Sequence, residues 1–289
     1  MKPSKFVRLS ASIFTIVVSS TVVLAQPPSK RGTFREIVEK RLKHRGIKLG
    51  DICPIDTNSA AHRIFSDYGA IFLSEADDRL PSRCIFASER EVTDFQNTLE
   101  STSTTIGGTT VTLRKSAMDA LLAAREEAIK KGLNITPRGG STASKRTFEE
   151  TVKFWNSRFL PGLEHWVASG KVSRKDADSA KKATSPVQVE KVLDWEKNGL
   201  YFSKDFSKSI LYSVAAPGAS QHIFLLALDV EQYSNRAVRQ ILAEHGWFQT
   251  VKSDLPHFTY LGVTEMELPA LGLRSTEIGN QVFWIPDFD

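Results

Sequence analysis

Two histidines and one aspartate in the C-terminal half of the chain have side chains that suit a catalytic metal site. His222 and Asp229 belong to one apolar segment, SQHIFLLALD, and His257 follows in DLPHFTY. A catalytic zinc site needs about three nitrogen or oxygen ligands and an open position for water, and these residues supply such a set. The other four histidines stand in charged surroundings or near the ends of expected helices, and we assign them to structure or solvent.

The spacing of the first two candidates constrains the local structure. Seven residues separate His222 from Asp229, and an odd interval along a regular strand would aim the two side chains at opposite faces. They converge only if His222 lies in the turn that enters the strand or if a bulge intervenes. Pro217 and Gly218, just upstream, favour such a turn.

These residues match the signature of a known family, SxHxxGxAxD followed later by ExxH. The matching positions are Ser220, His222, Ala227 and Asp229 in the first motif and His257 in the second. In this respect the chain resembles the zinc D-alanyl-D-alanine carboxypeptidases of VanY type and their peptidoglycan endopeptidase relatives. The resemblance covers roughly residues 111–263, and it implies that His222, Asp229 and His257 hold Zn²⁺.

The resemblance also implies roles for three further residues. The family has an arginine ahead of a helix that holds the substrate's carboxylate, and Arg146 in SKRTF is the best counterpart, with Arg138 as the alternative. A planar guanidinium pairs with a carboxylate at two points, although an arginine at a helix start can also be simply solvated. Asp254 takes the place of the general base, and Ser220 is implied to polarise the scissile carbonyl or to hold its loop.

Two positions depart from the family pattern. Asp254 stands where the family has the glutamate of ExxH, and its side chain is shorter by roughly 1.5 Å. Leu225 replaces the family's glycine, and in a regular strand it would share a face with Asp229 and crowd the site. Either change could alter the choice of substrate or abolish turnover.

Helices precede strands among the elements that must position these residues. Apolar periodicity with start and stop signals predicts helices from Ser116 to Gly132, from Thr147, and from Ser185 to Gly199. After Gly199 the period shortens towards two, so that the expected strands are 200–202, 209–215, 222–230, 247–251 and 258–263, interrupted by a helix at 234–244. We therefore expect an α+β fold, with helices packed on a small antiparallel sheet that carries the zinc site, and an N-terminal extension.

The first 25 residues have the pattern of a secretory signal. Three basic residues precede an apolar run that is too short for a comfortable membrane span, and Gln26 and two prolines follow at once. An uncleaved signal anchor is the alternative. Removal of residues 1–25 takes away three basic and no acidic side chains, which leaves 35 Lys and Arg against 33 Asp and Glu. This balance, without a basic stripe, argues against nucleic acid as a partner.

Three regions follow from this organisation: a signal peptide over 1–25, an N-terminal region over 26–110, and a VanY-like peptidase domain over 111–289. The two cysteines, Cys53 and Cys84, lie in the second region. In an exported chain such a pair most often forms a disulfide, whereas two buried free thiols are the competing interpretation. The residues of this region do not indicate a function.

Three hypotheses for function remain at this stage. The first is a secreted or periplasmic zinc metallopeptidase that cleaves peptidoglycan stem peptides, with a carboxypeptidase favoured and an endopeptidase still open. The second, motivated by Asp254 and Leu225, is a non-catalytic relative that binds peptidoglycan or a protein partner. In the third, both histidines are ordinary core or surface residues. No stable membrane span is expected after signal cleavage, and the oligomeric state is not predicted.

Overall fold

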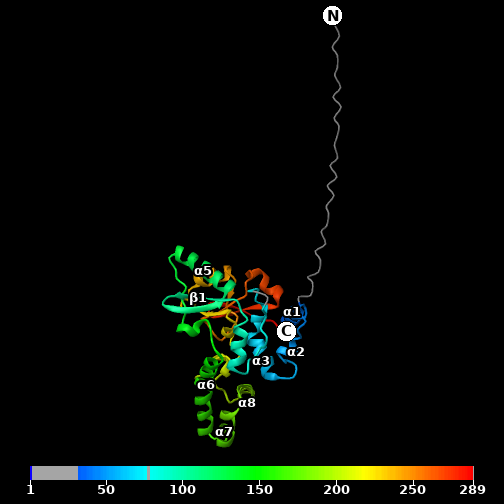
Figure 1. Cartoon of the computed structure of the whole chain (residues 1–289), viewed down its shortest axis with the longest axis vertical. Coiled ribbons are helices and arrows are strands. Elements are labelled where there is room, and N and C mark those ends of the chain that lie inside the picture. The colour runs from blue at the N-terminus through cyan, green and yellow to red at the C-terminus, as the bar shows by residue number, and fades with distance from the viewer. Residues whose placement is uncertain (2–31, 77–78, 289) are drawn as a thin grey trace. The chain divides into compact units, whose positions relative to one another are not determined.

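The computed structural model describes residue 1 and residues 32–76 and 79–288 (Figure 1). The predicted signal peptide lies outside the described residues apart from Met1. Residues 32–289 form one compact unit. Among the described residues, no helix is both long and apolar enough to span a bilayer.

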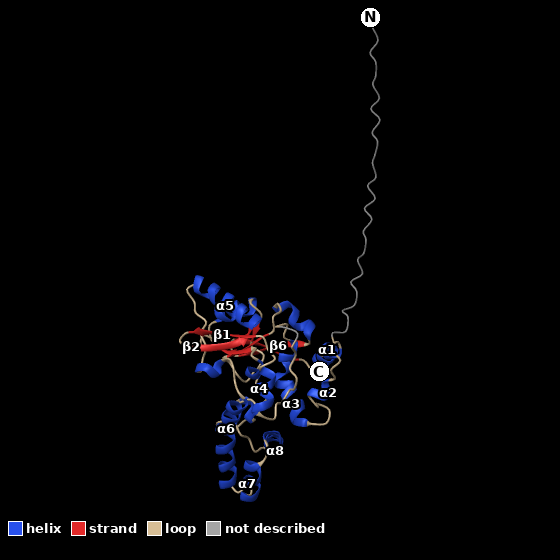
Figure 2. Cartoon of the chain, viewed as in Figure 1, coloured by secondary structure: helices blue, strands red, loops and turns tan. Residues whose placement is uncertain are grey.

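Helices make up most of the regular structure (Figure 2). The α-helices are α1 (Phe34–Lys43), α2 (Leu49–Ile52), α3 (Ser59–Tyr68), α4 (Glu89–Gln96), α5 (Lys115–Lys130), α6 (Phe148–Ala168), α7 (Arg174–Lys182), α8 (Ser185–Lys197) and α9 (Arg236–Glu244). The 3₁₀ helices are η1 (Gly69–Leu73), η2 (Gly140–Ala143), η3 (Ile210–Tyr212), η4 (Gln221–Phe224) and η5 (Glu265–Leu271).

The strands form one central sheet and two hairpins, all antiparallel. The central sheet has the order β3 (Ala227–Asp229), β5 (His257–Tyr260), β4 (Trp247–Phe248), and the hairpins are β1 (Ser101–Ile106) with β2 (Thr109–Arg114) and β6 (Leu273–Ile278) with β7 (Gln281–Pro286). Helices α5 and α9 contact each other, and they also contact β2 and β4 respectively. The α+β class with small antiparallel sheets is therefore confirmed.

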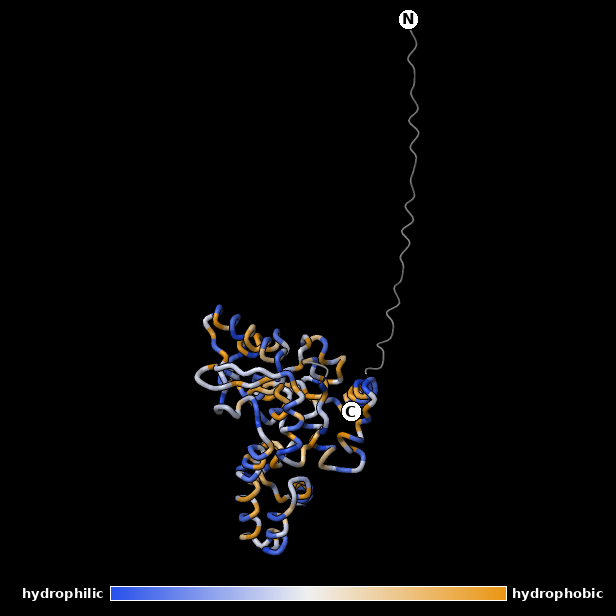
Figure 3. The backbone as a smooth tube through the Cα atoms, viewed as in Figure 1, coloured by the Kyte–Doolittle hydropathy of each residue, from blue (hydrophilic) through white to orange (hydrophobic). Residues whose placement is uncertain are grey.

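The predicted helices are confirmed, and local signals explain where they begin. Thr147 and Glu150 form the expected capping box at the start of α6, and Trp155 and Phe159 on its apolar stripe are fully buried. Asn235 caps α9 by accepting from two backbone N–H groups of its first turn. Figure 3 shows apolar and polar stretches alternating along such helices, as expected for elements that bury one face.

Several predicted strands are wrong or shorter than expected. Residues 200–202 are not in a strand, the segment 209–215 contains η3, and the segment 222–230 begins as η4 and becomes the short strand β3. For the last of these segments the cause is burial: residues 221–230 are all buried, so their apolar pattern carries no helical or strand period.

Two hydrophobic clusters divide the interior. The larger contains Phe34, Val38 and Phe65 from the N-terminal region together with Leu225 and Phe258 near the candidate site. The smaller gathers side chains from α3, α6, α7 and α8. The boundary predicted near residue 110 falls inside the compact unit, and the division into two sequence regions stays a prediction.

Two links tie distant parts of the chain together. A disulfide joins Cys53 and Cys84, which confirms the expected pairing. In addition, the backbone N–H of Phe34 donates to the carbonyl of Asp287 at 3.0 Å, and the rings of Phe34 and Phe288 pack with centroids 5.5 Å apart. The start of α1 is thereby joined to the segment that follows β7.

Candidate metal centre

Three secondary-structure elements bring the sequence-predicted ligands together. Asp229 ends β3, His257 begins β5, and the two residues are direct partners across the antiparallel pair. Such partners have neighbouring side chains on one face of a sheet. His222 reaches the same place from η4, which is the turn that enters β3, so the geometric condition set by the odd spacing is met.

The ligand atoms of these residues form a small, nearly equilateral triangle. His222 Nε2 lies 3.1 Å from His257 Nδ1 and 3.3 Å from Asp229 Oδ1, and His257 Nδ1 lies 3.2 Å from the same carboxylate oxygen. Zinc bonds of about 2.0–2.1 Å at tetrahedral angles place neighbouring ligand atoms about 3.3 Å apart. The triangle therefore has the dimensions that a tetrahedral metal site requires.

Hydrogen bonds behind each imidazole determine which nitrogen faces the triangle without a proton. His222 Nδ1 lies 3.0 Å from the carbonyl oxygen of Ser144, an acceptor only, so Nδ1 carries the proton and Nε2 presents a lone pair. The amide nitrogen of Gln221 donates to the carbonyl of Tyr68, which leaves Gln221 Oε1 to accept from His257 Nε2 at 2.8 Å. His257 Nδ1 thus also presents a lone pair.

Two imidazole lone pairs and one carboxylate oxygen consequently converge with no proton between them. These three groups repel one another unless a cation lies at their centre, and neutral imidazole with carboxylate is a preferred zinc ligand set. Both histidines and Asp229 are also less than a tenth exposed, so solvent cannot relieve the repulsion effectively. The group could hold a metal ion, and its donor chemistry fits one.

Arg146 holds the outer oxygen of the aspartate. Its Nη2 donates to Asp229 Oδ2 at 2.7 Å and its Nε donates to the carbonyl of Thr142, while its guanidinium lies over the ring of Phe154. This pair leaves Asp229 Oδ1 directed at the imidazoles. The expected role of Arg146 as an anchor for the substrate's carboxylate stays a prediction, because one of its donors already has a carboxylate partner. Arg138 instead forms an exposed ion pair with Glu231.

The charges of the centre keep its ligands in the states that bind metal. Burial lowers the pKa of His222 to about 4, and the positive charge of Arg146 adds to this effect. Burial alone would raise the pKa of Asp229, but this pKa lies well below its usual range, and the ion pair with the Arg146 guanidinium at 2.7 Å favours the ionised form. His222 is therefore neutral and Asp229 ionised at neutral pH, as metal ligation requires.

Asp254 and Ser220 lie beside the centre, in a pocket of about 300 Å³ that His222 and His257 also line. In the part of the chain that the structure describes, the carboxylate of Asp254 has no hydrogen-bond partner. Burial raises the pKa of Asp254, and the negative charge of Asp229 raises it further. An unpaired carboxylate with a raised pKa is suited to accept a proton near neutral pH. Ser220 is 3% exposed, and its carbonyl accepts from Ile223 within the turn.

The expectation that Leu225 crowds the site is wrong. Leu225 is not in the strand but ends η4 in the left-handed conformation, with φ of 56°. Its side chain lies in the larger hydrophobic cluster, and its carbonyl accepts from the backbone N–H of Arg114. The left-handed conformation is one that glycine adopts without strain, which explains in physical terms why the resembled family has glycine there.

Several residues that support the centre were not predicted from the sequence. Gln221 and Ser144 set the protonation of the imidazoles, and Thr142 positions Arg146. Ser144 also accepts from the backbone N–H of Thr112 in β2, so the hairpin is tied to the centre. Only the position of Gln221 inside the first motif could have drawn attention to it, because Ser144 lies 78 residues from His222 and Thr142 acts through a backbone carbonyl.

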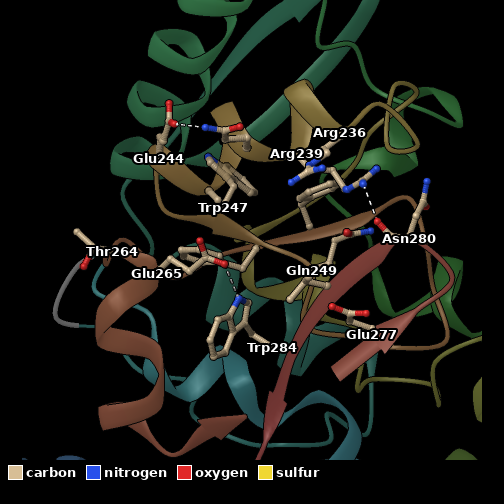
Figure 4. Close-up of a pocket in the computed structure, with 15 residues that line it drawn as sticks. Arg236, Arg239, Glu244, Trp247, Gln249, Thr264, Glu265, Glu277, Asn280 and Trp284 are labelled. Carbon is tan, nitrogen blue, oxygen red and sulfur yellow. Dashed lines mark hydrogen bonds between the residues drawn. The ribbon is translucent and has the colours of Figure 1, made fainter. Parts of the chain in front are cut away.

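A larger pocket of about 900 Å³ lies elsewhere, between α9, η5 and the β6–β7 hairpin (Figure 4). Trp247 and Trp284 contribute to its lining, and Trp284 donates to Glu265 at 3.1 Å. Its lining includes none of the three candidate ligands. The chemistry suggested by the sequence thus belongs to the smaller pocket.

Comparison with known proteins gives little beyond this geometry. No protein-family model matches the chain, and no curated protein matches it. The chain is similar, at 17% identity, to the LdcB LD-carboxypeptidase, whose solved structure reveals the molecular basis of peptidoglycan recognition. The similarity covers 52% of this chain and 60% of that one, with a TM-score of 0.29. A likeness of this size does not establish a shared fold.

Proposed function

We propose that this protein is a zinc-dependent peptidase that cleaves peptidoglycan stem peptides. The observation that carries the proposal is the convergence of two unprotonated imidazole nitrogens and one carboxylate oxygen beside an unpaired carboxylate in a pocket. Metal site and proton acceptor together are the parts that metal-assisted hydrolysis needs. The substrate class comes from the motif resemblance, in which Ser220, His222, Asp229 and His257 stand at the family's positions.

Each residue then has a defined part. His222, Asp229 and His257 would hold zinc, and Arg146 keeps Asp229 in place through its outer oxygen. Bound zinc supplies Lewis-acid chemistry, which polarises a scissile carbonyl and lowers the pKa of a coordinated water. Asp254 accepts the proton of the attacking water and delivers it to the leaving amine, so that the acid–base cycle closes. Ser220 lies on the pocket wall, within the proposed binding surface.

The proposal extends to where and on what the protein acts. We assign it to the secreted or periplasmic space, consistent with its disulfide and the predicted signal peptide. Within peptidoglycan we favour a D-alanyl-D-alanine carboxypeptidase over an endopeptidase, because a pocket of about 300 Å³ is small for a ligand site.

The direct test combines metal analysis with turnover. The purified mature protein should hold one equivalent of zinc and release D-alanine from a muramyl pentapeptide. His222→Ala and His257→Ala should lose both properties, since each removes one of three ligands. His62→Ala, outside the pocket, serves as the matched control. Absence of stoichiometric zinc from the folded wild type would contradict the proposal.

A second function is favoured by one observation, the aspartate at the position of the family's glutamate. A shorter acid can fail to reach the attacking water, and the protein would then bind peptidoglycan or a protein partner without turnover. Turnover by the wild type and by Asp254→Glu separates these functions. Activity that appears only in the glutamate variant would identify a binding protein, whereas activity in the wild type would identify an enzyme.

A further inference from the structure

The pocket beside the metal centre contains a second guanidinium that the function proposed above does not use. Arg158, on α6, lines this pocket together with Arg146 and Asp254. Its Nη1 donates only to the carbonyl and hydroxyl oxygens of the neighbouring Ser157, at 3.2 and 3.1 Å. Its Nε is buried and has no hydrogen-bond partner in the described chain.

The two arginines of the pocket differ in their electrostatic partners. Arg146 is paired with Asp229, whereas Arg158 has no carboxylate within ion-pair distance among residues 32–76 and 79–288. A buried N–H without an acceptor destabilises the structure, because it has lost its hydrogen bond to water without gaining another. A ligand carboxylate would satisfy this donor and could use the planar fork of the guanidinium at two points. Arg158 is therefore poised for an anion that enters the pocket.

Helix geometry gives Arg158 a definite place along the pocket. Phe154 and Arg158 are four residues apart on α6, so they lie on one face of the helix, separated by about 6 Å along its axis. Phe154 in turn contacts the guanidinium of Arg146, which holds Asp229 of the metal centre. One wall of the pocket thus runs from the metal centre past Phe154 to Arg158.

We propose that Arg158 binds the C-terminal carboxylate of the peptide substrate and makes the site specific for chain ends. The inference rests on the proposed peptidase function. The motif resemblance would assign the binding of the substrate's carboxylate to Arg146. Here that role falls instead to Arg158, which has no competing carboxylate partner among the described residues. The pocket volume of about 300 Å³ suits the end of a peptide better than a chain that passes through.

The test is a cycle that changes the arginine and the ligand together. An acetylated tripeptide that ends in D-alanyl-D-alanine and has its scissile amide replaced by a non-hydrolysable isostere is compared with its C-terminal amide by calorimetric binding to zinc-loaded wild type, Arg158→Gln and Arg158→Lys. We expect the wild type to prefer the acid by about 10- to 100-fold, the strength of a charged hydrogen-bonded pair. Arg158→Gln should bind acid and amide alike, at the wild type's affinity for the amide, and Arg158→Lys should keep part of the preference.

Controls separate this inference from the function on which it rests. Zinc content should be equal in all variants, because Arg158 contacts none of the three ligands. Lys153→Gln removes an exposed cation of α6 that does not line the pocket and should leave the preference unchanged. Equal binding of acid and amide by the wild type, no binding of either, or an undiminished preference in Arg158→Gln would overturn the inference, even if the protein holds zinc and releases D-alanine. Absence of zinc or of turnover in the wild type would instead overturn the proposed function.

Discussion

Gln221 and Ser144 decide how the two imidazoles of the centre behave, although neither provides a ligand atom. Each accepts a hydrogen bond from the protonated ring nitrogen of one histidine. The ring is thereby held with its other nitrogen facing the candidate metal position. Such outer hydrogen bonds orient ligands and raise their basicity. The ligands themselves could be predicted from their residue types, but these supports could not, because Ser144 acts through a backbone carbonyl that every residue has.

Removal of the Gln221 acceptor should weaken metal binding. In Gln221→Leu, the His257 ring loses its partner at Nε2 and is free to protonate Nδ1 instead, so we expect zinc affinity to fall by about 10- to 100-fold. Competition with a chromophoric chelator measures the change. Gln221→Glu keeps an acceptor and is the matched control; equal losses in both variants would contradict this explanation.

The buried state of His222 predicts a pH dependence of stability in the metal-free protein. Its pKa is lowered from 6.5 to about 4, so between these values the unfolded chain binds more protons than the folded one. This residue's contribution to the free energy of unfolding is complete above about pH 6.5 and declines as the pH falls, by up to about 3 kcal/mol. Urea denaturation of wild type and His222→Gln across this window measures it; parallel pH profiles would show that His222 is not responsible.

At the scale of elements, η4, the turn that enters β3, decides where His222 points. The helices of the protein could be predicted because capping and apolar periodicity are local signals, as Thr147 at the start of α6 illustrates. A turn into β3 was expected from the odd spacing and from Pro217 and Gly218, but its 3₁₀ form and its extent could not be predicted, since residues 221–230 are all buried and the apolar pattern has no period. The β6–β7 hairpin was missed for the opposite reason: β6 is mostly exposed and carries little apolar alternation.

Leu225 allows a sharp test of that turn. Its left-handed conformation is unfavourable by about 1–2 kcal/mol for a residue with a Cβ, while loss of a buried leucine side chain destabilises by about 2–5 kcal/mol. Both Leu225→Ala and Leu225→Gly should therefore lower the free energy of unfolding. The glycine variant should be the more stable of the two, by about 1 kcal/mol, because only glycine escapes the strain. Chemical denaturation of both decides; a more stable alanine variant would refute the assignment.

At the scale of the whole molecule, the N-terminal region and the site-bearing region are stabilised by a common core. Phe34 and Phe258 belong to one hydrophobic cluster, and the Cys53–Cys84 disulfide lies within it. The cysteine pairing could be predicted because two cysteines allow only one bridge. The shared core could not, because contacts between residues far apart in the chain leave no trace in either segment alone.

Loss of the disulfide should destabilise the molecule without dismantling the centre. Cys53→Ser with Cys84→Ser reopens a loop with a sequence separation of 31, for which the chain-entropy model gives about 3–4 kcal/mol. The three ligands lie outside this loop, so zinc stoichiometry of the folded variant should stay the same. Urea denaturation and metal analysis test the two halves; loss of zinc from the folded variant would contradict the second.

The bond between Phe34 and Asp287 has a consequence for the order of events during synthesis. A chain emerging from the ribosome exposes α1 early, but the backbone acceptor and the aromatic ring that cover its first residue follow about 250 positions later. Helix α1 therefore waits without its final cover until nearly all of the polypeptide is available. If the chain is exported, as proposed above, this delay favours passage through the translocation machinery as an open chain, with compaction completed on the far side.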